Sequence, residues 1–91
     1  MTTRNDIKEW FDEAKKEKYD FLLVVCDTFD WGDYPVKVKA KDFAEKFVYY
    51  NGNNMQKIME IYDLSKSRDN QLKEQKSWNL PKKFKKTYWQ I

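Results

Sequence analysis

The sequence predicts a small α+β domain, a three-stranded sheet with helices packed on it, in the chain order α-β-β-α-β-α. Three observations lead to this fold class. The one long apolar run, Phe21 to Cys26, is typical of a strand that is covered on both faces. Segments with apolar residues at helical spacing lie before and after it. The chain has 91 residues, which is the size of one domain.

Residues 3–18 are predicted to form the first helix. Thr3 can cap its first turn, with Asp6 three residues later in the place where a Glu or Gln is usual. Apolar side chains then recur at the spacing of one helix face: Ile7, Trp10, Phe11 and Ala14. This periodicity favours a core role for Trp10 and Phe11 over contact with a ligand.

A β-hairpin is predicted next, with strands at residues 19–27 and 34–40. The unbroken apolar run places the first strand in the middle of the sheet. In the second strand valines alternate with lysines, so one face is buried and the other exposed. Pro35 has no N–H to donate, which marks the start of a strand or an edge of the sheet. Cys26 is expected to be a buried, inert thiol because the chain has no His to activate it.

The remaining predicted elements are a helix at residues 41–50, a strand at 55–64 and a helix at 65–76. An Asn-Gly pair after the second helix supplies the left-handed conformation that ends a helix. The segment 55–64 fits a helical stripe as well as a strand. We predict a strand because a two-stranded hairpin alone is barely stable. The third helix is expected to be mostly exposed, with Ser67 as its N-cap.

Composition argues against several functional classes. The chain has one Cys and no His, so an internal disulfide is impossible, and neither a metal site nor a cofactor is expected. Without His, a GxSxG motif or an activated Ser or Lys, no catalytic residue stands out, and we expect that the protein is not an enzyme. The longest apolar run is too short to span a membrane and a single Cys fits a reducing compartment, so a cytoplasmic protein is expected. A net charge of +3 is too mild for a protein that binds duplex DNA.

An acidic and aromatic loop, Thr28 to Tyr34, is the main candidate site. Four carboxylates flank or occupy the hairpin and form an Asp cluster: Asp20, Asp27, Asp30 and Asp33. Carboxylates at a strand end can hold Mg²⁺, but no phosphate-binding loop accompanies these, and Asp is common in turns. The same loop offers flat rings for stacking and carboxylates that can accept hydrogen bonds from guanine. A well-packed aromatic turn explains this composition equally well. Because aromatic residues make up 18% of the chain, more than a small core buries easily, some rings are expected to bind a partner.

Two further segments are candidates. The turn from Asn51 to Gln56 carries amides that suit base edges or ribose hydroxyls, although an Asn-rich turn is an equally good explanation. We expect residues 1–80 to form one domain and residues 81–91 a basic, aromatic tail. Lysines interleaved with rings suit single-stranded nucleic acid, but a solvated terminus is the simpler explanation. Trp89 and Ile91 can also pack on a neighbouring subunit.

Three pieces of the chain resemble a family of short phage proteins: LLVVCDTFDWGDYPVKV, then NNMQKIMEIYDL, then a polar helix that ends in SWN. The resemblance runs from Ile7 to Leu80, and its most specific part is the pattern VVCDTFDxxDYPV. The chain is similar to the anti-CBASS sponge proteins, which bind a host's cyclic oligonucleotide alarm signal without cleaving it. Such proteins are small, cytoplasmic and oligomeric, with ligand sites at subunit interfaces.

The resemblance implies a homo-oligomer that sequesters a cyclic dinucleotide, such as 3′,3′-cGAMP, in the host cytoplasm. The residues that it places at the ligand are Thr28, Phe29, Asp30, Tyr34, Asn54, Gln56 and Trp78. A base would stack on Phe29 or Tyr34, polar side chains would read its edge, and Thr28 with a Lys would meet phosphate. Three alternatives stay open: a protein-binding inhibitor of a host defence or replication factor, a nuclease built on the Asp cluster, and a single-strand binder acting through the tail.

Overall fold

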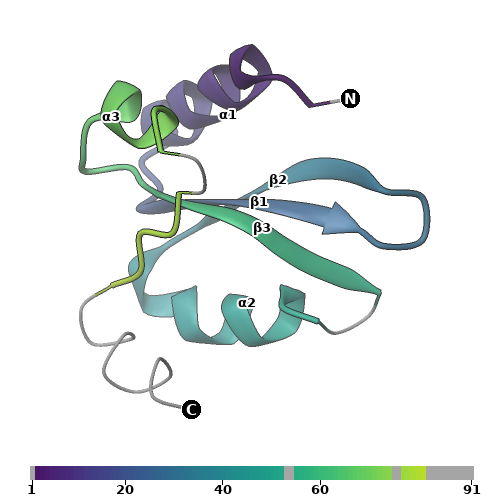
Figure 1. The fold of residues 1–91 in the computed structure, drawn as a ribbon. Coiled ribbons are helices and arrows are strands. Elements are labelled where there is room, and N and C mark those ends of the chain that lie inside the picture. The colour runs from purple at the N-terminus through teal and green to yellow at the C-terminus, as the bar shows by residue number, and fades with distance from the viewer. Residues whose placement is uncertain (1, 53–54, 75–76, 82–91) are drawn as a thin grey trace.

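The computed structural model describes residues 2–52, 55–74 and 77–81, and it confirms the α+β fold and the order of its elements (Figure 1). The helices and strands are α1 (Arg4–Lys16), β1 (Phe21–Asp27), β2 (Gly32–Val38), α2 (Phe43–Tyr50), β3 (Gln56–Asp63) and α3 (Arg68–Leu72). A short 3₁₀ turn, Ala40–Asp42, leads into α2. Beyond Pro81, the predicted tail lies outside the described residues. In the described part of the chain, no helix combines the length and the apolar character that crossing a membrane requires.

The three strands form one antiparallel sheet in the order β2-β1-β3, so β1 is the central strand, as predicted. α1 and α3 lie over one face of the sheet and α2 lies over the other (Figure 1). Every residue from Phe21 to Cys26 is buried, because helices cover both faces of β1. The sheet therefore has two cores, one on each face.

Alternate residues of β1 supply these two cores. On the α1 face the buried apolar residues are Ile7, Phe11, Ala14, Leu22, Val24, Tyr62 and Leu64. On the α2 face they are Phe21, Leu23, Val25, Val38, Phe43, Ile58, Ile61 and Leu80. Phe11 is fully buried, as predicted, and Trp10 packs against the same core while partly exposed.

The helix caps that the sequence predicts are present. The N–H of Asp6 donates to Thr3 Oγ1 at 3.2 Å and the N–H of Thr3 donates to Asp6 Oδ2 at 3.0 Å, which is a complete capping box. Gly52 follows α2 with a φ of +88°. Ser67 caps α3 by accepting from the N–H of Asn70 at 3.3 Å.

A β-bulge explains why the third strand resembles a helix in sequence. Val25 pairs with Ile58 and Val24 with Glu60, so Met59 is an extra residue in β3. The insertion shifts the alternation of side chains. Ile58 and Ile61 therefore share the α2 face although they are three residues apart. The strand prediction is confirmed, and the bulge accounts for the helix-like spacing of the apolar residues.

The third helix is shorter than predicted, and one of its polar residues is buried. α3 covers five residues, against the predicted span of 65–76, and Gln71 is 3% exposed. Its amide pairs with the backbone of Asp63: Oε1 accepts from the N–H at 2.7 Å and Nε2 donates to the C=O at 2.9 Å. Next to it, Ile61 forms a parallel bridge with Trp78. These contacts cover the outer edge of β3 at its C-terminal end.

Candidate functional site

Two loops that the sequence singles out meet at one end of the sheet. The N–H of Thr28 donates to the C=O of Met55 at 2.8 Å, which ties the β1–β2 turn to the connection between α2 and β3. Of the predicted amide-rich turn, Gln56 begins β3, whereas Asn54 lies outside the described residues. We call this end the tip and define it by residues 28–31, Tyr34, Tyr49, Tyr50, Met55 and Gln56.

The β1–β2 turn is tighter than predicted, because β2 begins at Gly32 rather than at Tyr34. Asp27 Oδ1 accepts from the N–H of Phe29 at 2.8 Å, and Asp30 Oδ1 accepts from the N–H of Gly32 at 2.9 Å. Trp31 takes a φ of +62° between them. Two of the loop's carboxylates therefore each use one oxygen to hold the turn, which is the ordinary role of Asp in a turn. The side chain of Asp30 nevertheless stays exposed.

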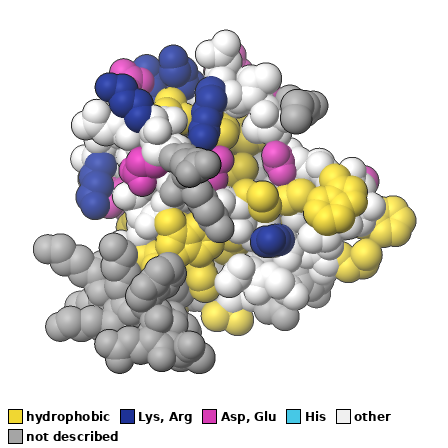
Figure 2. Space-filling view, in the orientation of Figure 1, with side chains coloured by type: hydrophobic (Ala, Val, Ile, Leu, Met, Phe, Trp, Pro, Cys, Tyr) yellow, Lys and Arg dark blue, Asp and Glu magenta, His cyan; other side chains and the backbone are white. Residues whose placement is uncertain are grey.

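The aromatic rings of the tip differ in exposure. Phe29 is 76% exposed and Trp31 is 73% exposed. Tyr34 instead packs partly buried against the α2-side core, with its ring edge-on to Tyr50 at 6.5 Å between centroids. Phe29 is therefore a more open platform for stacking than Tyr34. Figure 2 shows apolar side chains gathered at the end of the molecule where the β1–β2 turn lies.

Tyr34 and Gln56, two predicted site residues from different strands, contact each other. Gln56 Nε2 donates to Tyr34 Oη. Gln56 Oε1 is buried and has no hydrogen-bond partner in the described part of the chain. Burial, and then the nearby Tyr50 and Asp27, raise the pKa of Tyr34, so its hydroxyl keeps its proton at neutral pH. The pair thus combines a buried amide oxygen that has no partner among the described residues with the O–H donor of Tyr34.

Trp78 lies away from the rest of the predicted site. It bridges Ile61, five residues along β3 from Gln56, and its ring packs edge-on to Phe47 at 6.1 Å. Five strand residues span about 16 Å. Trp78 therefore supports the α2-side core, and it does not join the tip in one subunit.

The electrostatics of the tip are acidic. Asp27, Asp30 and Asp33 lie at or beside the turn, and none of them forms an ion pair within residues 2–52, 55–74 and 77–81. Burial, followed by a hydrogen bond with Asp33, raises the pKa of the Cys26 thiol, so it stays protonated and is a poor nucleophile. No group of three or more potential metal ligands occurs among the described residues.

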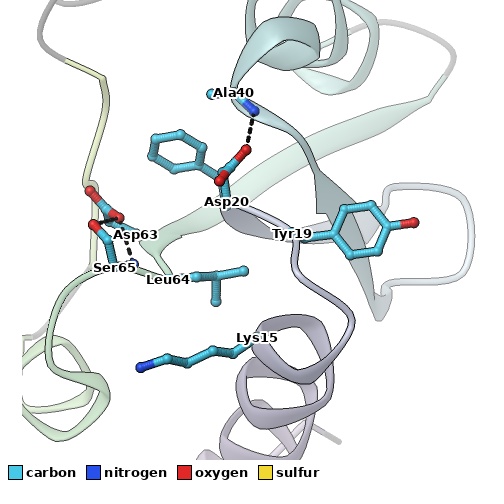
Figure 3. A pocket seen from close by; sticks show the side chains of 8 residues that line it. Lys15, Tyr19, Asp20, Ala40, Asp63, Leu64 and Ser65 are labelled. Atoms are coloured by element: carbon cyan, nitrogen blue, oxygen red, sulfur yellow. Dashed lines mark hydrogen bonds between the residues drawn. The ribbon is translucent and has the colours of Figure 1, made fainter.

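A hollow with a volume of about 390 Å³ lies at the end of the sheet opposite the tip (Figure 3). Its two carboxylates already accept hydrogen bonds from backbone N–H groups. Asp20 Oδ2 accepts from the N–H of Ala40 at 2.7 Å, and Asp63 Oδ1 accepts from the N–H and hydroxyl of Ser65 at 2.9 and 2.6 Å. Lys15 lines the same hollow from α1. The two carboxylates of this hollow therefore have a structural role.

The sequence analysis missed three members of the tip. Tyr49 and Met55 are 51% and 58% exposed, and Tyr50 packs edge-on to Tyr49 at 4.7 Å. The sequence signal for the two tyrosines was their position as a pair at the end of the second predicted helix. Comparison with protein-family models, with curated proteins and with solved structures finds no match for this chain. The tip itself is therefore the structural basis for a functional proposal.

Proposed function

We propose that the chain is a phage protein that sequesters a cyclic dinucleotide defence signal, such as 3′,3′-cGAMP, in the host cytoplasm without cleaving it. The observation that carries this proposal is an exposed Phe29 ring at the same tip as a Tyr34–Gln56 pair with an unused amide oxygen. A base stacked on the ring can direct its hydrogen-bonding edge toward this pair. The motif resemblance supports the same ligand class.

Charge determines how such a ligand lies. The carboxylates of Asp27, Asp30 and Asp33, at or beside the turn, repel phosphate, so the bases face the turn. The exposed carboxylate of Asp30 then accepts from a guanine N1–H and N2–H₂. Lys57 follows Gln56 in β3, so its side chain points to the opposite face of the sheet from the Gln56–Tyr34 pair. The phosphates therefore require a cation from another subunit. This requirement favours a homo-oligomer with the ligand at the interface.

A sponge acts by mass action, so its affinity and its inability to turn over the ligand are both measurable. The experiment titrates 3′,3′-cGAMP and a panel of cyclic di- and trinucleotides into the protein by calorimetry. The complex is then heated, and the supernatant is analysed by mass spectrometry. Intact ligand that is released only on heating supports sequestration. No binding to any member of the panel contradicts it, and a hydrolysed product indicates a nuclease instead.

Matched variants locate the site. Phe29→Ala removes the stacking platform, and because this ring is exposed, the variant should unfold at the same urea concentration as the parent. One lost stack costs about 1–3 kcal/mol, so the Kd should rise roughly 5- to 150-fold. Asp30→Asn keeps the turn acceptor for Gly32 but replaces the carboxylate, and it should weaken guanine-containing ligands most. Lys16→Ala, on an exposed part of α1, is the control and should leave the Kd unchanged.

The alternative function, a protein-binding inhibitor of a host defence or replication factor, has its own supporting observation. The exposed large apolar residues of the described chain lie in the turn, near the end of α2, just before β3 and within β3: Phe29, Trp31, Val48, Tyr49, Met55 and Met59. An apolar surface with an acidic rim suits a basic protein partner. A stoichiometric host protein retained from lysate by the parent, and lost with Tyr49→Ala, favours this alternative over a nucleotide.

A further inference from the structure

A hollow on the other side of the β1–β2 turn has no role in the proposed function. It has a volume of about 600 Å³ and lies between α1 and the start of β2. The residues that line it are Thr2, Asp6, Trp10, Trp31, Gly32 and Asp33. We call it the tryptophan hollow. It faces the α1 side of the sheet, whereas Tyr34 packs on the α2 side.

The chemistry of the tryptophan hollow suits a segment that carries both cations and rings. Tryptophan faces attract ammonium groups, and Trp31 is 73% exposed. Asp33 adds a carboxylate that forms no ion pair with any described residue. Asp6 adds a second carboxylate, of which Oδ2 accepts from the N–H of Thr3. A lysine-rich, aromatic peptide is therefore complementary to this surface.

The chain itself contains such a peptide. Residues 82–91, KKFKKTYWQI, place four lysines and three aromatic rings within ten positions. Phe84 lies between two pairs of lysines, and Tyr88 and Trp89 follow them. The positive charges of this segment complement the carboxylates of the hollow, and its rings can pack against the hollow's tryptophans.

In the same molecule, the chain after Pro81 starts at the end of the sheet that lies opposite the hollow. The parallel bridge between Ile61 and Trp78 sends the chain toward the C-terminal end of β3, away from the β1–β2 turn (Figure 1). Leu80 is then buried in one core with Phe21, at the start of β1. The seven residues of β1 are about 20 Å long. The backbone of the five residues after Pro81 spans at most about 18 Å. The hollow lies level with the last residues of β1, where Asp33 pairs with Cys26, and on the α1 face of the sheet rather than the α2 face that buries Leu80.

We propose that the tryptophan hollow binds residues 82–91 of a second copy of the chain. The partner's lysines contact the carboxylates and the Trp faces, and its rings pack over the exposed Trp31. If each copy inserts its segment into the other, the exchange closes into a two-fold dimer. This association requires no ligand, so its test is separate from that of nucleotide binding.

The test measures the mass of the full chain by sedimentation velocity across a dilution series at low and high salt. A dimer that dissociates as salt rises is expected, because ion pairs at a surface are screened. Deleting residues 82–91 should give a monomer. Trp31→Asn should weaken the dimer about tenfold or more, and it is a mild change because Asn accepts the φ of +62°. Phe29→Ala is the matched control from the same turn, and it should leave the dimer intact.

Cross-linking identifies which segment occupies the hollow. One chain carries Trp31→Cys and the other carries Phe84→Cys, so a disulfide between them joins two copies by definition. The native Cys26 is 5% exposed and should not compete. The expected result is a covalent heterodimer, absent when Glu45→Cys on α2 replaces Trp31→Cys. A monomeric full chain, a dimer that survives deletion of the segment, or equal cross-linking to position 45 would overturn the proposal.

Discussion

Gln71→Leu is expected to destabilise the domain far more than the position of Gln71 in a short surface helix suggests. The side chain is 3% exposed. Its amide accepts from the N–H of Asp63 at 2.7 Å, and it donates to the C=O of Asp63 at 2.9 Å and to that of Ser67 at 3.1 Å. In effect the amide acts as one residue of a fourth strand, because it pairs with both edge-facing groups of Asp63.

The expected loss of stability comes from the backbone groups that Leu leaves without a hydrogen-bond partner. Leu has a similar volume, so the main loss is of polar partners for the N–H and C=O of Asp63. A buried backbone group without a partner costs about 1–3 kcal/mol. Asp63 is only partly buried, so water can reach part of its backbone, and we expect a total loss of about 2–4 kcal/mol. A domain of this size has about 5–15 kcal/mol of stability, so the effect is large.

Urea unfolding followed by tryptophan fluorescence measures this loss. Gln71→Glu is the informative partner variant, because its carboxylate can still accept from the N–H of Asp63 but cannot donate to a carbonyl. Acidification protonates that carboxyl group and should recover part of the stability, measured against the parent at the same pH. Lys73→Ala, on the exposed side of the segment, is the control. A loss below about 0.5 kcal/mol for Gln71→Leu, the size of an ordinary surface effect, would refute the reasoning.

Three further changes test other parts of the fold. Burial and a hydrogen bond to Glu60 raise the pKa of Tyr62, so the unfolded chain loses this proton first. The free energy of unfolding should therefore fall as pH rises above about 10, by up to about 1.4 kcal/mol per pH unit, and Tyr62→Phe should remove that part of the slope in urea titrations. Gly52→Ala should cost about 1 kcal/mol through the φ of +88° alone, since the added Cβ meets open space, and Gly52→Asn should cost less. Tyr34→Phe leaves the amide of Gln56 without its acceptor and should cost about 1 kcal/mol in urea unfolding.

The parts of the fold that were predictable depend on local patterns. An apolar run without alternation identifies a central strand, and the spacing of Thr3 and Asp6 identifies a helix start, because the residues that decide each feature are neighbours in sequence. The burial of Gln71 was not predictable in this way. Its partner, Asp63, is eight residues away and belongs to an element whose edge is visible only once the sheet is assembled. The Met59 bulge belongs to the same class, because it exists only relative to β1.

The candidate site also has a part that local sequence predicts and a part that depends on non-local contacts. The loop composition predicted that rings and carboxylates would lie together, and Phe29 and Trp31 are indeed exposed. Sequence could not show that Tyr34 turns into the core to meet Gln56, since that contact joins two strands that are separated by β1. Nor could it separate Trp78 from the tip. Pairing register, which is a non-local property, decides which residues share an end of the sheet.

The two ends of the sheet are built differently, and this difference bears on both proposals. At the C-terminal end of β3, the amide of Gln71 covers the strand edge. At the tip, one backbone hydrogen bond from Thr28 joins the two connections, and the adjoining turn exposes two large rings. A single residue, Asp30, separates Phe29 from Trp31 in that turn. Phe29 nevertheless belongs to the proposed nucleotide site and Trp31 to the tryptophan hollow. An occupant on either side restricts the same short turn, so ordering by one reduces the entropy lost on binding the other. By reciprocity, docking of the partner's residues 82–91 should raise the affinity for the nucleotide by the same factor as the nucleotide strengthens the dimer.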